Sequence, residues 1–232
     1  PIGSDPTSPY EFSFVVPTGN PTLVIEARAI DSLGQMSTTM IDLKVQPPPQ
    51  PLTIDQIVVN GGDAQRSTID VIEVQFSGDT NIGALITNTQ ILQAVQIISL
   101  ATGNPLALAV SNYLYNAAAF SLAINLAGFA LADGQYELAL DTNLITSMAG
   151  TASLVDGDGI LDGFHRFAFH KVNADFDGDG VIGVGDLILL RASYFAVLGA
   201  ANYFAYLDLN GDGRIDAADY AALRRRFGLM TP

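Results

Sequence analysis

The chain has 232 residues and a mass of 24.5 kDa, enough for roughly one to three domains with buried cores. Its 24 acidic residues outnumber the 10 lysines and arginines, and the net charge of −14 repels phosphate groups and anionic lipid. Nucleic acids and membrane surfaces are therefore poor partners. The chain contains no cysteine, which excludes disulfides, thiolate metal sites and cysteine nucleophiles.

The longest apolar stretch, residues 117–132, is interrupted by Ser121 and Asn125 and falls short of the roughly 20 residues of a helical membrane span. We therefore expect no membrane span. The sequence starts at Pro1 without a methionine or a signal-like leader. We expect that an N-terminal segment of the protein is missing from it.

Residues 1–46 show the alternation of apolar and polar residues that is typical of strands. The apolar positions are Phe12, Phe14 and Val16, then Leu23, Ile25, Ala27 and Ala29, then Ile41, Leu43 and Val45. Three strands are few for an independent sandwich, so we expect the C-terminal strands of a truncated domain. The prolines within residues 47–51 predict a stiff, extended linker.

Residues 52–171 continue the alternation, with turn residues between short segments. The predicted strands contain Ile72, Val74 and Phe76; Phe120, Leu122, Ile124 and Leu126; and Tyr136, Leu138 and Leu140. This pattern predicts an antiparallel two-sheet sandwich. Segments 27–34 and 133–140 resemble the late strands of bacterial Ig-like repeat modules, which implies Ig-like folds for residues 1–46 and 52–171.

Residues 172–232 change to a helical period. Apolar residues recur at spacings of three and four, first at Leu187, Leu190 and Tyr194 and then at Tyr220, Leu223 and Phe227. We expect each set to form the apolar face of a short helix. The whole chain is therefore predicted to be multidomain, mainly β, with a small α-helical domain at its C-terminal end.

Two acidic segments in this last domain repeat each other with an offset of 33 residues, as 175–186 and 208–219. Oxygen ligands at positions 1, 3, 5 and 12, a carbonyl at position 7 and glycine at position 6 are typical of an EF-hand calcium loop. The first loop offers the side chains of Asp175, Asp177, Asp179 and Asp186 and the carbonyl of Val181. The second offers Asp208, Asn210, Asp212 and Asp219, the carbonyl of Arg214, and Asp216 to hold a water.

We therefore expect two Ca²⁺ sites. Without metal the clustered carboxylates repel one another, so ion binding is expected to order a domain of only about 60 residues.

The paired loops, the aspartate at position 12 and the matching Leu190-Arg191 and Leu223-Arg224 resemble a dockerin, the type I duplicated F-hand module. The resemblance covers roughly residues 173–228. It implies a non-catalytic module that docks onto a cohesin-type receptor, often attached to secreted polysaccharide-degrading enzymes or cell-surface proteins.

Cellulosomal dockerins commonly carry hydroxyl residues just before position 12, where this chain has Val184-Gly185 and Ala217-Ala218. Because this chain lacks those hydroxyl residues, the alternative is that it docks through an apolar face that contains Leu189 and Tyr220. Two further alternatives remain open. In the first, the module docks on the preceding Ig-like domain of the same chain and stabilises it. In the second, the chain is the tail of an extracellular hydrolase whose catalytic domain lies upstream.

An additional acidic run contains Asp156, Asp158 and Asp162 and could supply a third cation site or form a plain acidic turn. The segment 178–183 matches G-x-G-x-x-G, but it lies inside an acidic loop with no preceding strand, which disfavours a dinucleotide site.

The two histidines, His165 and His170, are expected to point to opposite faces of one strand as ordinary strand residues. The three arginines at 224–226 are expected to complement the helix dipole and the nearby acidic loops rather than to form a recognition patch.

The sequence contains no nucleophile elbow, zinc-protease motif or phosphate-binding loop. We therefore expect no catalytic site within these residues. The predicted function is calcium-dependent attachment at the C-terminal end of a secreted or cell-surface bacterial protein.

Overall fold

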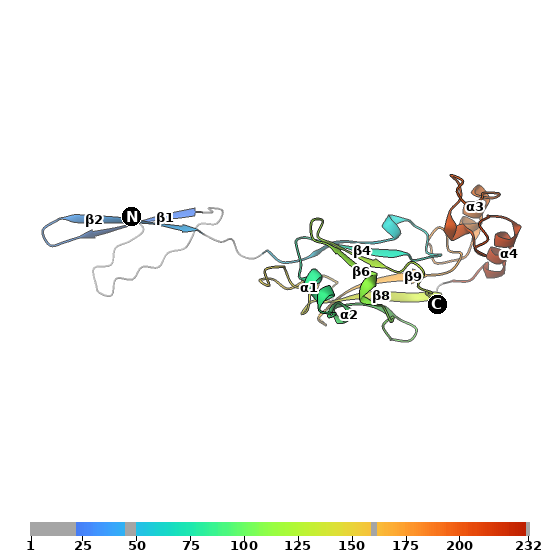
Figure 1. Cartoon of the computed structure of the whole chain (residues 1–232), viewed down its shortest axis with the longest axis horizontal. Helices are drawn as coiled ribbons and strands as arrows, with labels where there is room; N and C mark the ends of the chain where they lie inside the picture. Colours follow the sequence, from blue (N-terminus) through green and yellow to red (C-terminus); the bar gives the residue numbers. More distant parts are fainter. Residues whose placement is uncertain (1–21, 45–49, 159–161, 231–232) are drawn as a thin grey trace. The chain divides into compact units, whose positions relative to one another are not determined.

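The structure is a computed structural model that describes residues 22–44, 50–158 and 162–230 (Figure 1). The chain divides into two compact units, residues 1–50 and 51–232. The strand expected at Phe12, Phe14 and Val16 and the prolines at 47–49 lie outside the described residues. Among the described residues, no helix combines the length and the apolar composition that crossing a bilayer requires.

The first unit contains the antiparallel strands β1 (Thr22–Ile30) and β2 (Met36–Lys44). They pair without a bulge from Thr22 opposite Lys44 to Ile30 opposite Met36. The Asp31 side chain closes the turn by accepting hydrogen bonds from the backbone N–H groups of Leu33 (2.9 Å) and Gln35 (2.8 Å). Both strands were expected, although β2 begins five residues before the predicted Ile41.

The second unit contains two antiparallel sheets among its described residues. The first has the order β3-β4-β7-β6, with β3 (Ile54–Val59), β4 (Val71–Phe76), β6 (Tyr113–Asn116) and β7 (Ser121–Asn125). The second has the order β5-β8-β9, with β5 (Val95–Ser99), β8 (Gly134–Asp141) and β9 (Phe164–Lys171). Short 3₁₀ turns are η1 (Asn60–Gly62), η2 (Val110–Asn112) and η3 (Ala205–Leu207).

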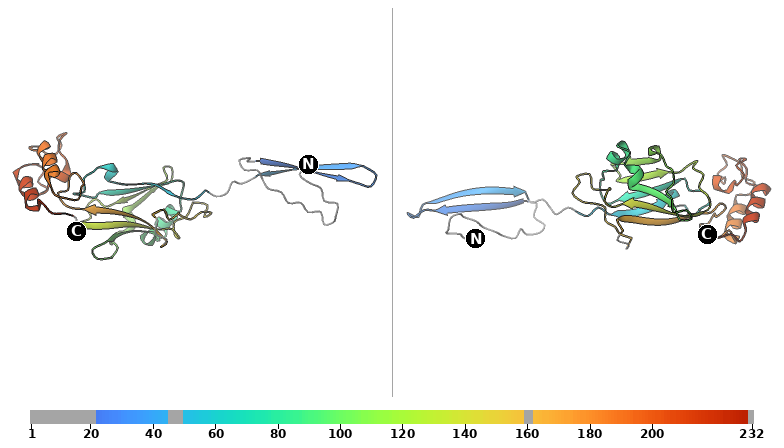
Figure 2. Two further views of the ribbon diagram at one scale, coloured as in Figure 1. Left: turned by 180° about the vertical axis from the view of Figure 1, so that it is seen from behind. Right: turned by 90° about the horizontal axis from the view of Figure 1, so that it is seen from below.

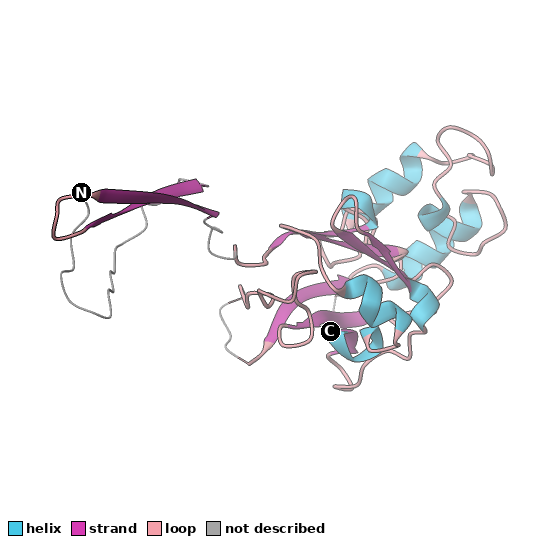
Figure 3. Cartoon of the chain, turned by 60° about the vertical axis from the view of Figure 1, so that its left-hand side comes forward, coloured by secondary structure: helices cyan, strands magenta, loops and turns pink. Residues whose placement is uncertain are grey.

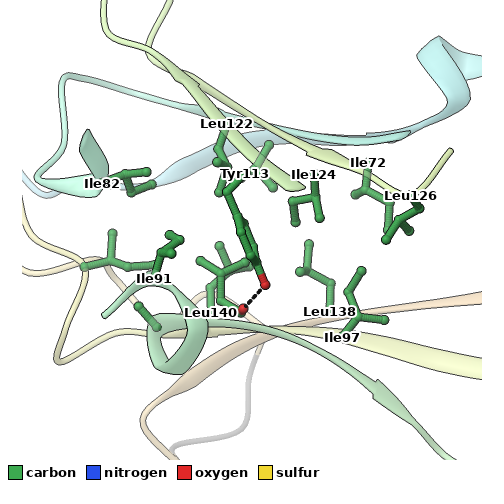
Figure 4. Packing of buried hydrophobic residues seen from close by; sticks show 14 of the residues in the cluster. Ile72, Ile82, Ile91, Ile97, Tyr113, Leu122, Ile124, Leu126, Leu138 and Leu140 are labelled. Carbon is green, nitrogen blue, oxygen red and sulfur yellow. Dashed lines mark hydrogen bonds between the residues drawn. The ribbon is translucent and has the colours of Figure 1, made fainter. Parts of the chain in front are cut away.

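One hydrophobic core fills the space between these sheets. Figure 4 shows Leu122 and Ile124 of one sheet facing Leu138 and Leu140 of the other, and all four are fully buried. Each such side chain stabilises the fold by roughly 1.5–3 kcal/mol. The Tyr113 hydroxyl donates to the carbonyl of Val95 (2.8 Å) inside this core, and burial raises the pKa of Tyr113 to about 12. The mainly β character expected for this segment is confirmed.

Two details of the core differ from the sequence-based expectation. The helices α1 (Ile82–Thr87) and α2 (Ile91–Ala94) interrupt a segment that was expected to form strands throughout. They cover one end of the core with Ile82 and Ile91, which are fully buried. Phe120 was expected to point into the core, but it lies in the β6–β7 turn with a φ of 51° and is 37% exposed.

The C-terminal part is helical, as expected, and has a hydrophobic cluster of its own. It contains α3 (Val184–Ala192) and α4 (Ala217–Arg226), which lie beyond one end of the β-sheets in Figure 2. Figure 3 distinguishes the helices of the chain, in cyan, from its strands, in magenta. Leu190 and Leu223 are buried as predicted. Tyr220 and Phe227, however, are 40% and 49% exposed, so the predicted apolar face of α4 is narrower than expected.

This helical part contacts the segment between β3 and β4 through backbone and side-chain hydrogen bonds. The N–H of Arg66 donates to the carbonyl of Asp175 (2.8 Å), and the N–H of Val172 donates to the carbonyl of Arg66 (3.0 Å). The Ser67 hydroxyl accepts from the N–H of Ala174 (2.9 Å). Because Ala174 is fully buried, this bond satisfies an amide that water cannot reach.

Asp133, between β7 and β8, ties the same two parts together. It accepts from Lys171 Nζ and from the N–H of Asn173, both at 2.8 Å, and forms an ion pair with Arg226 at the end of α4. Arg226 Nε also donates to the carbonyl of Asn173 (2.8 Å). Arg226 therefore pairs with Asp133 of the β-sheet part. The three arginines at 224–226 had instead been expected to complement the helix dipole and the acidic loops.

Candidate metal centre

The first acidic loop is wound around the side chain of Asp175, which is fully buried. Asp175 Oδ1 accepts a hydrogen bond from the N–H of Gly178 (2.7 Å), and Oδ2 accepts one from the N–H of Gly180 (3.1 Å). At the other end of the loop, the buried Asp186 accepts from the N–H groups of Phe176 (2.5 Å) and Gly183 (2.6 Å). These bonds aim both carboxylates at the inside of the loop.

The second loop repeats this scheme 33 residues later. Asp208 accepts from the N–H groups of Gly211 (2.8 Å) and Gly213 (2.7 Å). Asp219, fully buried, accepts from those of Leu209 and Asp216, both at 2.8 Å. The two loops are therefore duplicates in hydrogen bonding as well as in sequence.

Each loop is also closed by the segment that follows the helix of the other loop. The N–H of Ile182 donates to the carbonyl of Leu229 (2.8 Å), and the N–H of Ile215 donates to that of Ala196 (2.9 Å). Leu229 and Ala196 are separated by the same 33 residues as the loops. This reciprocal pairing gives the C-terminal part an approximate twofold relation between its halves.

The carboxylates of the first loop converge on one point. Asp175, Asp177 and Asp186 each have an oxygen within 4.8 Å of the others. Burial, followed by repulsion from Asp186 and Asp179, raises the pKa of Asp177 and outweighs the hydrogen bond from the backbone of Asp179. An all-oxygen donor set that carries several negative charges fits a hard divalent cation such as Ca²⁺.

The region that contains the two loops is similar to a known protein family. Residues 173–228 match the model of the dockerin type I domain. The C-terminal domain is a dockerin. Dockerins are non-catalytic, calcium-binding modules of protein–protein attachment, so the predicted family and the predicted class of interaction are confirmed.

No curated protein matches the chain. The solved structures that are similar to it include two of type II Cohesin-X-Dockerin complexes from Acetivibrio cellulolyticus. A C-terminal interface mutant is 17% identical, with 60% of this chain and 83% of the other covered and a TM-score of 0.25. An N-terminal interface mutant is also 17% identical, with 62% and 88% covered and a TM-score of 0.26. The family assignment therefore rests on residues 173–228.

At its third position the second loop of the dockerin has the neutral Asn210, where the first loop has Asp177. Burial opposes ionisation of Asp208, but hydrogen bonds from Tyr203 and from the backbone outweigh it, so the pKa of Asp208 lies below its usual value. Asp216, expected to hold a water, accepts from the N–H of Ala218 (2.8 Å) and caps α4.

The remaining predicted ligands lie along the two loops. Asp179 accepts from the N–H of Val181 (2.8 Å), and Asp212 accepts from that of Arg214 (2.9 Å). Asp179 does not belong to the converging group of the first loop. Coordination by Asp179, by Asp212 and by the carbonyls of Val181 and Arg214 stays a prediction.

Two contacts to the loops were not predicted from the sequence. His170 Nε2 lies 2.8 Å from Asp175 Oδ2, and the Tyr203 hydroxyl donates to Asp208 Oδ2 (2.7 Å). His170 had been expected to be an ordinary strand residue. Extending the 33-residue repeat upstream of the loops would have paired His170 with Tyr203.

The third acidic run does not form a comparable group among the described residues. Asp158 accepts from the N–H of Arg166 (2.8 Å), and Asp162 forms an ion pair with the Arg166 side chain (2.9 Å). Both oxygens of Asp156 are buried without a hydrogen-bond partner. A cation site at Asp156, Asp158 and Asp162 stays a prediction.

Proposed function

We propose that this chain is the non-catalytic, calcium-dependent attachment region of a secreted or cell-surface bacterial protein. The dockerin binds a cohesin-type receptor, and the β-rich segments before it are Ig-like spacers. The observation that carries this proposal is the duplication of two acidic loops with the same hydrogen bonding around buried carboxylates. Such loops present oxygen ligands in the pattern that Ca²⁺ requires.

Two calcium ions bind, one in each loop. In the first loop the ligands are Asp175, Asp177, Asp179 and Asp186 with the Val181 carbonyl. In the second they are Asp208, Asn210, Asp212 and Asp219 with the Arg214 carbonyl and a water held by Asp216. Millimolar calcium outside cells suits sites with a Kd of about 10⁻⁴ to 10⁻³ M.

The receptor binds the exposed sides of α3 and α4. Val184 and Ile188, one helical turn apart on α3, are 63% and 62% exposed. The corresponding side of α4 presents Ala217, Tyr220 and Arg224, which are also exposed. Leu189, which had been expected on this face, is instead half-buried and lines a shallow groove with Ala64 and Gln65 of the β-sheet part.

The domain division that we propose has four parts: residues 1–46, a truncated Ig-like unit; 47–51, a linker; 52–171, an Ig-like sandwich; and 172–232, the dockerin domain. The separate hydrophobic clusters on either side of Val172 support the last boundary. The two facing antiparallel sheets support the sandwich.

A second function, stabilisation of the sandwich by the dockerin, is favoured by the contacts between them. Asp133, Arg66 and Ser67 of the sandwich all form hydrogen bonds with residues 172–226. If the dockerin acts as a staple, calcium should raise the melting temperature of the sandwich as well as that of the loops.

Capture of receptors tests the attachment function. The immobilised chain should retain purified cohesin domains in calcium and release them in excess EDTA. The double variant Asp175→Ala/Asp208→Ala should retain none, and Ile188→Arg should bind calcium but not the receptor. Leu114→Arg, at a 71% exposed position on β6, serves as the matched control. Capture that persists in EDTA would contradict calcium-dependent attachment.

A further inference from the structure

His170 and Tyr203 occupy equivalent places relative to the two acidic loops. Each lies five residues before the first aspartate of its loop. His170 Nε2 is 2.8 Å from Asp175 Oδ2, and Tyr203 Oη is 2.7 Å from Asp208 Oδ2. An imidazole and a phenol therefore reach the same carboxylate oxygen, at the same loop position, from the same distance along the sequence.

The Tyr203 hydroxyl donates to Asp208. The role of His170 Nε2 depends on the tautomer of the ring, and the tautomer with hydrogen on Nε2 is the one that can donate to an ionised carboxylate. In each loop the same Oδ2 atom also accepts a backbone hydrogen bond, from Gly180 (3.1 Å) or Gly213 (2.7 Å). The side-chain donor adds a bond to the first aspartate that does not come from the loop itself.

We propose that His170 and Tyr203 are positioning residues for the two calcium sites: each holds the first aspartate of its loop in the orientation that binds the ion. This inference rests on the proposed function, because it presumes that the loops bind Ca²⁺. Donors that orient a metal-binding side chain before the ion arrives reduce the ordering that binding must impose, and their loss typically weakens metal affinity 10- to 100-fold.

The two donors differ in where they come from. His170 lies on β9, where it pairs with Gln135 of β8, so its position is fixed by the sheet of the sandwich. Tyr203 lies between α3 and η3, inside the dockerin. The first calcium site therefore depends on the last strand of the sandwich, whereas the second depends only on the dockerin. Ion binding at the first site is thereby coupled to the contact between the two parts.

Calcium titration calorimetry of the full chain tests this assignment. In an Asp208→Ala background, which isolates the first loop, His170→Ala should weaken Ca²⁺ binding about 10- to 100-fold. His170→Gln, whose amide can donate in place of Nε2, should recover most of the affinity. In an Asp175→Ala background, Tyr203→Phe should weaken the second site by a similar factor, since it removes the hydroxyl but keeps the ring.

Each variant should leave the other site unchanged. Matched controls are His165→Ala, a β9 histidine whose Nδ1 accepts from the N–H of Gly157, and Tyr220→Phe, an exposed tyrosine of α4. Far-UV circular dichroism in EDTA reports whether each variant folds like the parent.

Unchanged affinities in His170→Ala and Tyr203→Phe, with calcium binding intact in the parent, would overturn this inference alone. So would an equal loss at both sites, because it would indicate general destabilisation. A parent protein that binds no calcium would overturn the proposed function as well.

Discussion

A Cβ atom on Gly178 would overlap the carbonyl oxygen of Ala64. Gly178 is the fourth residue of the first acidic loop, and Ala64 lies in the segment that connects β3 to β4. The backbone of the loop thus packs directly on the segment between β3 and β4. At Gly211, the equivalent position of the second loop, an added Cβ would have no atom within 4 Å.

This difference predicts unequal effects of two matched substitutions. Both glycines have a positive φ, 78° at Gly178 and 72° at Gly211, so alanine at either position costs about 1 kcal/mol of conformational strain. Gly178→Ala should reduce the free energy of unfolding by at least twice as much as Gly211→Ala, since it also displaces the loop from Ala64. Denaturant unfolding in saturating calcium measures both values. Equal losses would show that the contact with Ala64 contributes nothing.

Because Arg226 forms an ion pair with Asp133, we expect substitutions of Arg226 and of the neighbouring Arg225 to differ in their effect on stability. Arg226→Gln should lower the free energy of unfolding by about 1 kcal/mol, because it removes bonds to Asp133 and to the carbonyl of Asn173. Arg225→Gln should change it by less than about 0.5 kcal/mol, since Arg225 is exposed. Thermal and denaturant unfolding of the two variants check this, and equal effects would contradict it.

The contribution of Asp133 to the stability of the protein should depend on pH. Burial opposes ionisation of Asp133, but bonds from Lys171 and the N–H of Asn173, together with the charges of Lys171 and Arg226, hold its pKa below the usual value. A lowered pKa in the folded state stabilises the protein above the unfolded-state value of about 4, and this contribution disappears as the pH falls through the folded-state pKa.

The parent should therefore be more stable than Asp133→Asn at pH 7, and the difference should shrink as the pH approaches 3. Because the acidic loops are the same in both proteins, their own titration cancels in the comparison. A difference that stays constant from pH 7 to pH 3 would show that the charge of Asp133 is unimportant.

Local sequence patterns predicted those elements whose side chains follow one simple period. The alternation around Ile72, Leu122 and Leu138 identified β4, β7 and β8, because one face of each strand is buried in a single core. The helices α1 and α2, of six and four residues, are too short to show a helical period. Their formation depends on burying Ile82 and Ile91 against the sheets.

The duplicated acidic loops could be recognised because their predicted ligands follow one another within twelve residues. The contacts that support the first loop could not, because they join distant segments. Ser67 and Ala174, for example, are 107 residues apart. Leu189 was expected on an exposed docking face because its neighbour is also distant in the sequence. Nothing in α3 itself shows that the segment around Ala64 lies beside Leu189.

Asp177 predicts effects of opposite sign in the presence and absence of calcium. Its carboxylate lies near those of Asp175 and Asp186, and its pKa is raised first by burial and then by the neighbouring charges. Without metal, Asp177→Asn should stabilise the protein slightly, by less than about 1 kcal/mol, because it removes a partly buried negative charge from a negative cluster.

With calcium, Asp177→Asn should weaken ion binding at the first site, because a charged ligand is replaced by a neutral one. Asn210 already occupies this position in the second loop, so the substitution fits the loop backbone. Unfolding in EDTA and calcium titration measure the two effects, and destabilisation in EDTA would show that the carboxylates of the first loop do not repel one another.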